Sequence, residues 1–379
     1  MKNRIRDIIT AVLCLQIMAG GYGAAGAETA AGGVTFPVSR DPDLGSTVIG
    51  IRTEDFNALG FEYGDSCDVL FSTGYSLQDI PYYDGYYTRT GEPQICAYPG
   101  YESPVVAINS GEPVWTAAGL SEGDTVTVTL REKGKYLQIQ QSLEMVYSLD
   151  RADYADDETF VNFRPLAGGQ LAENRVYRGA SPVDNRMRRA GTADRLLAQN
   201  GIRFVLDLAD TEETLKAFRA QEGFDSPHFM GLHENGQALL LGLNNNFRGE
   251  AFRHTLADAL RAMAQSEGPA YIHCLEGKDR TGFVCMLLEA LAGASYEEIL
   301  ADYMATYRNY YGITEETTPE KYQAVVSVKF NDLLQMLTGL PDGSDYGGTV
   351  LRDSARQYLL DSGMTETEVD GLTDWLTRK

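Results

Sequence analysis

The sequence predicts a small all-β, barrel-like domain followed by an α/β domain, in which a parallel-sheet core is flanked by helices. The chain has 379 residues, which is long enough for two domains. Apolar and polar positions alternate within 35–150, as in the run Val-Thr-Val-Thr-Leu at 126–130, and this is typical of half-buried strands. Later, helix-like segments and short apolar runs follow one another, which favours an α/β sheet. We therefore expect a β-rich domain at 35–150 and an α/β domain at 153–379.

The first 27 residues have the order of a secretory signal peptide. Basic residues open the chain, an apolar stretch follows at 8–19, and small residues stand at 25–27. The apolar stretch is too short for a good membrane anchor. We therefore expect residues 1–27 to be removed and the mature chain, starting near Glu28, to have no stable membrane span. The protein is then exported to the periplasm, the cell surface or the medium. Residues 28–34 are small and polar, which indicates a linker.

Charge and cysteine content restrict the partners and the covalent structure. The formal net charge is −22, so nucleic acid and anionic membranes are unfavourable partners. A local anion cradle can still hold a phosphorylated substrate against that field. In an exported protein Cys67 and Cys96 could form a disulfide, or they could be two separate buried thiols, and both alternatives stay open. Cys285 is expected in the core.

The β-rich part contains a faint internal repeat. Residues 59–65 (Leu-Gly-Phe-Glu-Tyr-Gly-Asp) resemble residues 118–124 (Ala-Gly-Leu-Ser-Glu-Gly-Asp), and each copy leads into a strand-like run. Such a duplication predicts a pseudo-symmetric barrel. The second copy contains the Gly-x-Ser-x-Gly string of serine hydrolases, but that motif needs a helix after it, and here a strand follows. We interpret it as a turn. Residues 132–135 predict another turn, leading into a strand at 136–139.

In the α/β part, several elements can be placed from their boundaries. Residues 193–200 predict a helix that ends at Gly201, and 202–208 predict a strand. Asp207 and Asp210 lie at the carboxyl end of that strand, where functional groups collect in open α/β sheets. Further helices are expected from Ser295 to about Tyr310, from Thr318 to Gly339, and from Thr365. The helical spacing of Tyr303, Tyr307, Tyr310 and Tyr311 favours packing over a substrate platform.

The residues that suggest a reaction lie between an apolar strand-like run at 270–272 and an apolar helix-like run at 283–288. Cys274 is followed six positions later by Arg280 and then by Thr281. A tight loop at a helix N-terminus directs backbone N–H groups inward, where they bind an anion and favour a thiolate. The guanidinium can hold two phosphoryl oxygens, and the threonine hydroxyl can donate to the departing sulfur. These groups suit thiolate attack on a phosphate ester, followed by hydrolysis of a phosphocysteine.

This run resembles the phosphate-binding loop of the cysteine-dependent tyrosine phosphatase superfamily. The string Gly-Lys-Asp-Arg-Thr-Gly at 277–282 is similar to that of the secreted bacterial tyrosine/lipid phosphatases. Residues 162–164 and 176–181 also resemble the opening segment of that family, with Pro165 in place of the more usual aspartate. The resemblance extends from about Phe160 to the C-terminus. A nucleotide-binding glycine-rich loop and a zinc site do not fit this stretch.

The resemblance implies a phosphoric monoester hydrolase of the protein-tyrosine-phosphatase type. Cys274 would be the nucleophile, and Arg280 would bind the phosphate. The expected substrate-binding residues are Leu275, Glu276, Gly277, Lys278 and Thr281. No metal and no other cofactor is expected, because the arginine and the loop amides supply the stabilising charge.

The general acid is expected at Asp279. In most of the superfamily an aspartate about thirty residues before the cysteine protonates the leaving oxygen, but residues 241–247 contain no acid, and the nearest is Glu250. In the resembling bacterial family, the aspartate inside the loop is implicated in catalysis. Asp279 could instead only brace the loop, and Asp210 and Asp207 are reserve candidates.

The substrate class is less well determined. Phosphotyrosine proteins, phosphoinositides and inositol polyphosphates are all compatible with the loop. Lys278 suits a second phosphate, whereas Glu276 repels polyanions, so we favour phosphotyrosine proteins. The alternative interpretation is a non-catalytic phospho-binding or cell-wall-binding protein in which the β-rich domain carries the function. The intact Cys274, Arg280 and Thr281 argue against it.

Overall fold

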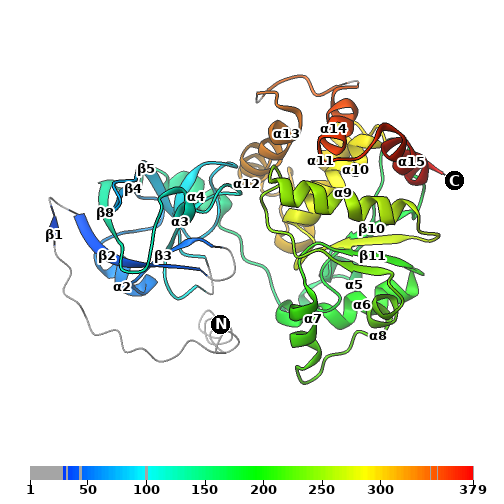
Figure 1. Cartoon of the computed structure of the whole chain (residues 1–379), viewed down its shortest axis with the longest axis horizontal. Helices are drawn as coiled ribbons and strands as arrows, with labels where there is room; N and C mark the ends of the chain where they lie inside the picture. Colours follow the sequence, from blue (N-terminus) through cyan, green and yellow to red (C-terminus); the bar gives the residue numbers. More distant parts are fainter. Residues whose placement is uncertain are drawn as a thin grey trace. The chain divides into compact units, whose positions relative to one another are not determined.

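In the computed structural model, the chain divides into two compact units between Glu144 and Met145 (Figure 1). From the sequence, we expected the boundary between the two domains to lie between residues 150 and 153. The described residues are 29–30, 33–41, 45–98, 101–341, 343–347 and 349–378. The expected signal peptide, residues 1–27, and the expected start of the mature chain at Glu28 lie outside them. Within these ranges, no helix combines the length and the apolar character that crossing a membrane requires.

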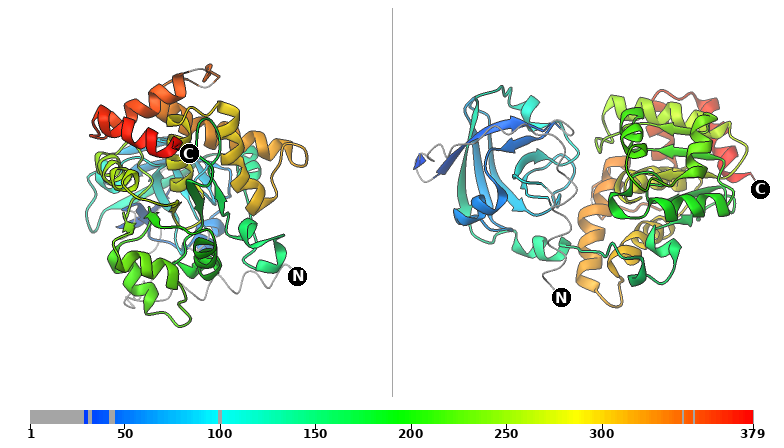
Figure 2. Two further views of the ribbon diagram at one scale, coloured as in Figure 1. Left: turned by 90° about the vertical axis from the view of Figure 1, so that its right-hand side faces the viewer. Right: turned by 90° about the horizontal axis from the view of Figure 1, so that it is seen from below.

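The first unit is a closed β-barrel. Its strands pair in the order β1-β2-β3-β7-β6-β5-β4-β8, and an additional pairing of β2 with β8 closes the ring (Figure 2). The strands are β1 (Thr29–Ala30), β2 (Gly33–Arg40), β3 (Thr47–Ile49), β4 (Ser66–Phe71), β5 (Ser76–Tyr83), β6 (Pro93–Cys96), β7 (Val105–Ile108) and β8 (Thr125–Glu132). The short helices are α2 (Thr53–Ala58), α3 (Val114–Ala117) and α4 (Leu137–Leu143).

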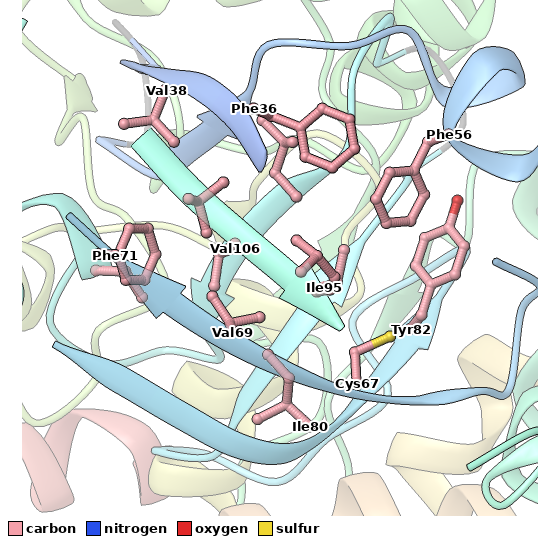
Figure 3. Packing of buried hydrophobic residues seen from close by; sticks show 14 of the residues in the cluster. Phe36, Val38, Phe56, Cys67, Val69, Phe71, Ile80, Tyr82, Ile95 and Val106 are labelled. Carbon is pink, nitrogen blue, oxygen red and sulfur yellow. The ribbon is translucent and has the colours of Figure 1, made fainter. Parts of the chain in front are cut away.

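The interior of the barrel is filled by apolar side chains from strands around the whole ring (Figure 3). Residues from β2, β4, β5, β6 and β7 point toward one another there: Phe36, Val38, Cys67, Val69, Phe71, Ile80, Tyr82, Ile95 and Val106. Phe56 of α2 belongs to the same core and stacks on Phe61, with ring centroids 4.3 Å apart. Cys67 and Cys96 are buried free thiols, so the alternative of two separate thiols holds.

The two copies of the internal repeat form the same turn. In the first copy, the Asp65 carboxylate accepts a hydrogen bond from the Glu62 N–H at 2.8 Å. In the second, the Asp124 carboxylate accepts one from the Ser121 N–H, also at 2.8 Å. The turns lead into β4 and β8, which pair antiparallel. The Gly-x-Ser-x-Gly string therefore lies in a turn before a strand, as expected.

Two expectations for the first unit were wrong. Residues 28–34 are not simply a linker, because β1 lies within them and β2 begins at Gly33. A Cβ at Gly33 would meet Thr129 Oγ1 at 2.5 Å, so the small residue reflects close packing against β8. Residues 136–139 are not a strand, because α4 begins at Leu137. The helix buries Gln140 and Leu143, which share a face only at helical spacing.

The second unit is a five-stranded sheet with helices on both faces (Figure 1). The strand order is β12-β11-β13-β10-β9. The strands are β9 (Arg164–Pro165), β10 (Val176–Gly179), β11 (Phe204–Asp207), β12 (Ala238–Leu240) and β13 (Ala270–His273). The pairings β10–β13, β11–β13 and β11–β12 are parallel, whereas β9 is antiparallel to β10. The sheet is therefore mixed at one edge.

The helices of this unit agree with the boundaries expected at Ser295, Thr365 and Gly201, whereas the helix expected at 193–200 begins at Ala190 and the one expected from Thr318 to Gly339 is interrupted. They are α5 (Asp157–Phe160), α6 (Ala190–Gln199), α7 (Glu212–Arg219), α8 (Pro227–Glu234), α9 (Glu250–Ala264), α10 (Asp279–Leu291), α11 (Tyr296–Tyr311), α12 (Pro319–Val325), α13 (Asn331–Thr338), α14 (Val350–Asp361) and α15 (Glu366–Thr377). Ser295 and Thr365 form capping boxes, and Gly201 and Gly339 have φ of +64° and +70° at helix ends. A π-helical turn, Val326–Phe330, separates α12 from α13.

The strand register decides where the functional residues meet. His273, the last residue of β13, lies opposite Gly179 of β10 and Asp207 of β11. The three carboxyl ends therefore coincide at one edge of the sheet. The loop after β13 leads directly into α10, in which every residue from Thr281 to Leu291 is buried. A buried strand and a buried helix thus hold both ends of the loop that begins at Cys274.

Candidate active site

The loop between β13 and α10 requires glycine at one position. Gly277 has a φ of +67°, and a Cβ there would lie 2.2 Å from the carbonyl oxygen of Gly179. Gly179 has a similar constraint, because a Cβ on it would meet the Tyr271 hydroxyl at 2.5 Å. The two backbones can approach this closely only because neither residue has a side chain. Gly277 was expected in the site, and the structure adds Gly179 as its counterpart.

The carbonyl groups of the loop are turned outward by hydrogen bonds. Leu275 O accepts from the Ser181 N–H at 3.0 Å, and Glu276 O accepts from the Tyr310 hydroxyl at 2.7 Å. Gly277 O accepts from Arg178 Nη2 at 2.9 Å. In a trans peptide the next N–H points opposite to the carbonyl. The N–H groups of residues 276–278 therefore point away from these donors, as an anion cradle requires.

The expected nucleophile and its neighbours lie at this cradle. The Cys274 side chain is buried, with the residue 4% exposed, and it precedes the N-terminus of the 13-residue helix α10. The N-terminus of a helix is a favourable position for a bound anion. Thr281 Oγ1 is buried, and no described residue forms a hydrogen bond with it, so it is available to a sulfur or a ligand. Arg280 is oriented by a hydrogen bond from Nη1 to Leu243 O at 2.7 Å.

A buried ion-pair network supports the loop from behind. Arg178, only 1% exposed, forms an ion pair with Asp302 and donates to Gly277 O. Arg164 Nε donates to the other Asp302 oxygen at 2.6 Å. Burial alone would raise the pKa of Asp302, but the two guanidinium groups outweigh it and hold the pKa below the usual value. Asn162, which donates to Gly277 O at 3.2 Å, completes the support.

Sequence reasoning did not assign a role to Asp302 or to His273. A signal for Asp302 exists, since it is an acidic residue spaced three and four positions from the buried Ile299 and Thr306 in the helix 296–311. Arg164 and Arg178 lie in the two segments that resemble the opening segment of the phosphatase family. The sequence did not show that both arginines pair with Asp302. The partners are brought together only by folding, because Asp302 lies more than a hundred positions along the chain from both arginines.

A second group of ionisable side chains lies where β11 and β13 end. Asp207 Oδ1 accepts from the N–H groups of Ala209 and Asp210 at 2.9 and 3.0 Å. His273 Nδ1 lies 3.2 Å from Cys274 O, so this nitrogen carries the proton and donates. His273 Nε2 faces Asp207 Oδ2 at 3.7 Å. The network thus connects the residue before the nucleophile to the carboxyl end of the neighbouring strand.

Burial shifts the titration of these three groups. It raises the pKa of Asp207 to about 6, and it lowers the pKa of His273 to about 4. Burial, together with the Asp207 charge, raises the pKa of Asp210 to about 7. Near neutral pH, His273 is therefore uncharged, and a substantial fraction of Asp210 carries a proton. A protonated carboxyl group at this edge of the sheet has the form that a proton donor needs.

The remaining predicted residues differ in their surroundings. Asp279 is the first residue of α10; its side chain is 52% exposed, and its carboxylate lies 3.8 Å from Lys278 Nζ. Lys278 also contacts Glu276 Oε2 at 3.1 Å and donates to the Tyr311 hydroxyl at 3.2 Å. Glu250 begins α9 and is exposed. The structure thus places Lys278 and Glu276 together, with Asp279 at the outer side of the loop.

The tyrosines of α11 have two roles. Tyr303, Tyr307 and Tyr310 are buried, which agrees with packing. Tyr310 also binds the loop carbonyl at Glu276, and Tyr311 contacts Lys278. The packing interpretation was therefore correct but incomplete, because two of these hydroxyl groups also hold the loop.

Comparison with known proteins adds a family. A family model described as "Tyrosine phosphatase family" matches residues 156–378, more than half of the chain. None of the curated proteins matches. One similar solved structure is the core catalytic domain of the PP-IP phosphatase SIW14 from S. cerevisiae in complex with citrate. The two chains are 17% identical, the match covers 47% of this chain and 91% of that chain, and the TM-score is 0.26. Another is P. aeruginosa TpbA, with 18% identity, coverage of 62% and 96%, and a TM-score of 0.23. The family match includes the whole loop from Cys274 to Thr281.

Proposed function

The chain belongs to the tyrosine phosphatase family and is a protein-tyrosine-phosphatase-like phosphatase, and from this premise we propose that it hydrolyses phosphotyrosine proteins through a phosphocysteine at Cys274. The observation that carries the proposal is the outward orientation of the loop carbonyls at residues 275–277. It leaves N–H groups beside the buried cysteine, where a phosphoryl group has to be held.

The reaction proceeds in two displacements. The Cys274 thiolate attacks phosphorus, and the P–S bond forms while the P–O bond to the leaving group breaks. Arg280 and the loop N–H groups stabilise the charge on the phosphoryl oxygens, and a carboxylic acid gives the leaving oxygen its proton. Water then attacks phosphorus and gives a proton to the carboxylate that was the acid in the first step, the P–S bond breaks, and inorganic phosphate leaves. The free hydroxyl of Thr281 donates to the sulfur as it departs.

Rates on different phosphate esters test the substrate class. We expect the full mature chain to hydrolyse para-nitrophenyl phosphate and to prefer a phosphotyrosine peptide over a phosphoserine peptide and a phosphoinositide, measured as kcat/KM. The physical reason for the discrimination against the phosphoinositide is that the loop offers one phosphoryl site beside a carboxylate, Glu276, that opposes polyanions. A clear preference for the phosphoinositide would move the assignment to the alternative, a phosphoinositide or inositol polyphosphate phosphatase. Binding of all of these esters without any turnover would instead return the chain to the non-catalytic class.

We assign the general acid to Asp279, with Asp210 as the second candidate. Asp279 lies inside the loop next to Arg280, and its exposed side chain can reach a leaving group outside the cradle. A specific observation favours Asp210: its pKa is raised to about 7, mainly by burial, so it is partly protonated at neutral pH. Asp207, fully buried and bound to two backbone N–H groups, is better suited to shaping the turn.

Leaving-group dependence distinguishes the two acids. An Asp279→Asn variant should lose about 10²-fold or more on phenyl phosphate, whose leaving group needs a proton, and far less on para-nitrophenyl phosphate. If Asp210 is the acid, Asp210→Asn shows this selective loss instead. In that case wild-type kcat/KM on phenyl phosphate also falls as the pH rises through about 7, because the protonated form disappears. Equal losses on both esters in the Asp279 variant would identify a structural role for that residue.

A further inference from the structure

A tyrosine outside the family-matched region contacts the phosphate-binding loop. Tyr147 precedes residue 156, where the family match begins. Its hydroxyl donates to Glu276 Oε1. The other carboxylate oxygen, Oε2, lies 3.1 Å from Lys278 Nζ. Glu276 is therefore held between a neutral donor and a cation, and it is only 8% exposed.

The position of Tyr147 is itself fixed by aromatic and cationic neighbours. Its ring stacks on Tyr310 with centroids 5.3 Å apart and meets Tyr311 edge-on at 5.4 Å. The Arg189 guanidinium lies 4.7 Å from the Tyr147 ring centre and 4.5 Å from that of Tyr310. Arg189 is in turn anchored by a hydrogen bond to Phe160 O at 2.6 Å. The hydroxyl of Tyr147 is thus presented to Glu276 by a rigid support.

This arrangement changes what the loop offers to a ligand. Burial opposes ionisation of Glu276, but the Lys278 charge and the Tyr147 hydrogen bond outweigh it, so the pKa lies below the ordinary value. The carboxylate is therefore ionised and neutralises Lys278. A second phosphate near the loop would have to displace a buried carboxylate from the lysine, at a cost in hydrogen bonds and charge pairing.

We infer that Tyr147 is a specificity-determining residue, which holds Glu276 on Lys278 so that the site accepts esters with a single phosphoryl group and disfavours polyphosphorylated ligands. The inference rests on the proposed function and deepens it. Tyr147 acts through Glu276 and does not need to touch the substrate. Its removal should therefore alter the choice between substrates more than the rate on a monophosphate.

The test compares kcat/KM on a phosphotyrosine peptide and on inositol hexakisphosphate. Relative to wild type, the ratio of the second value to the first should rise at least about tenfold in Glu276→Gln, because Lys278 loses the nearer and more buried counter-charge and keeps the exposed Asp279 at 3.8 Å. In Tyr147→Phe the ratio should rise about three- to tenfold, because the carboxylate loses one donor. Adding Tyr147→Phe to Glu276→Gln should give no further rise, since the tyrosine acts through that carboxylate.

A matched control removes a tyrosine hydroxyl elsewhere in the same unit. Tyr177 is buried, and its hydroxyl donates to Asn174 Oδ1 at 2.9 Å. Tyr177→Phe should leave the ratio unchanged. An unchanged ratio in Tyr147→Phe, or an equal further rise when it is combined with Glu276→Gln, would overturn the inference.

A binding measurement separates this inference from the proposed reaction. In a Cys274→Ser background, calorimetry gives the affinities for inositol hexakisphosphate and for inorganic phosphate without turnover. The relative affinity for inositol hexakisphosphate should rise in both the Tyr147→Phe and the Glu276→Gln variants. If wild type turned over neither ester, the proposed function would fail, and the binding ratio would still decide the role of Tyr147.

Discussion

A Cys274→Ser variant is expected to lose turnover of para-nitrophenyl phosphate by a factor of roughly 10⁴ or more, as happens when a catalytic nucleophile is removed. In the proposed reaction a thiolate attacks phosphorus, and a serine hydroxyl cannot replace it because it is not appreciably ionised. Serine is close to cysteine in size, and the site is already built from polar backbone groups. The variant should therefore fold normally and still bind a phosphotyrosine peptide.

The control for this experiment is Cys285→Ser. Cys285 is also a buried free thiol in α10, within electrostatic range of the Arg178–Asp302 pair behind the loop. The substitution makes the same chemical change, so it should reduce stability but retain turnover. Substantial activity in Cys274→Ser, with the native fold verified by circular dichroism, would eliminate covalent catalysis by this cysteine.

A Gly277→Ala variant should lose about 10²-fold or more in kcat/KM, although it leaves every polar side chain in place. The added Cβ would lie 2.2 Å from Gly179 O, and the residue has a φ of +67°. The loop must therefore move away from β10, and the bond from Arg178 to Gly277 O is disturbed. Displacement of a cradle by about 1 Å can cost this much in rate. Denaturant unfolding should also show a loss of roughly 1–3 kcal/mol.

Gly293→Ala separates strain from steric conflict. Gly293 has a φ of +80°, and nothing lies within 4 Å of the position of its Cβ. Its alanine variant should lose about 1–2 kcal/mol from the left-handed conformation alone, and it should retain wild-type kcat/KM. Equal activity losses in the two variants would mean that the contact with Gly179 is not what makes the glycine necessary.

Much of the site was predictable because its signals are local. The order of Cys274, Arg280 and Thr281 after an apolar run and before a buried helix predicted the strand–loop–helix corner and a phosphatase, and β13, α10 and the family match confirm both. Helix boundaries at Ser295 and Thr365 were equally clear, since a capping box involves residues three positions apart. Such features depend only on residues that are close in the sequence. Regular secondary structure fixes the geometry of those residues relative to one another.

The sequence alone was misleading where the decisive contact is distant. The small residues at 28–34 suggested a linker, but Gly33 is small because β8 packs against it. The run at 136–139 alternates like a strand, yet the helix α4 begins within it. The residues that this helix buries, Gln140 and Leu143, lie beyond the run. Propensity over a few residues is weak, and tertiary packing overrides it.

The sequence by itself determined that the chain is a phosphatase and that a loop between a strand and a helix begins at Cys274, because the spacing of a strand, a tight loop and a helix specifies an anion cradle locally. Only the tertiary structure decided which residues hold the loop in place and which charge the Glu276 side chain carries. The outward carbonyls depend on Ser181, Arg178 and Tyr310, and the state of Glu276 depends on Tyr147. A buried polar group needs a partner, and folding can supply that partner from anywhere along the chain.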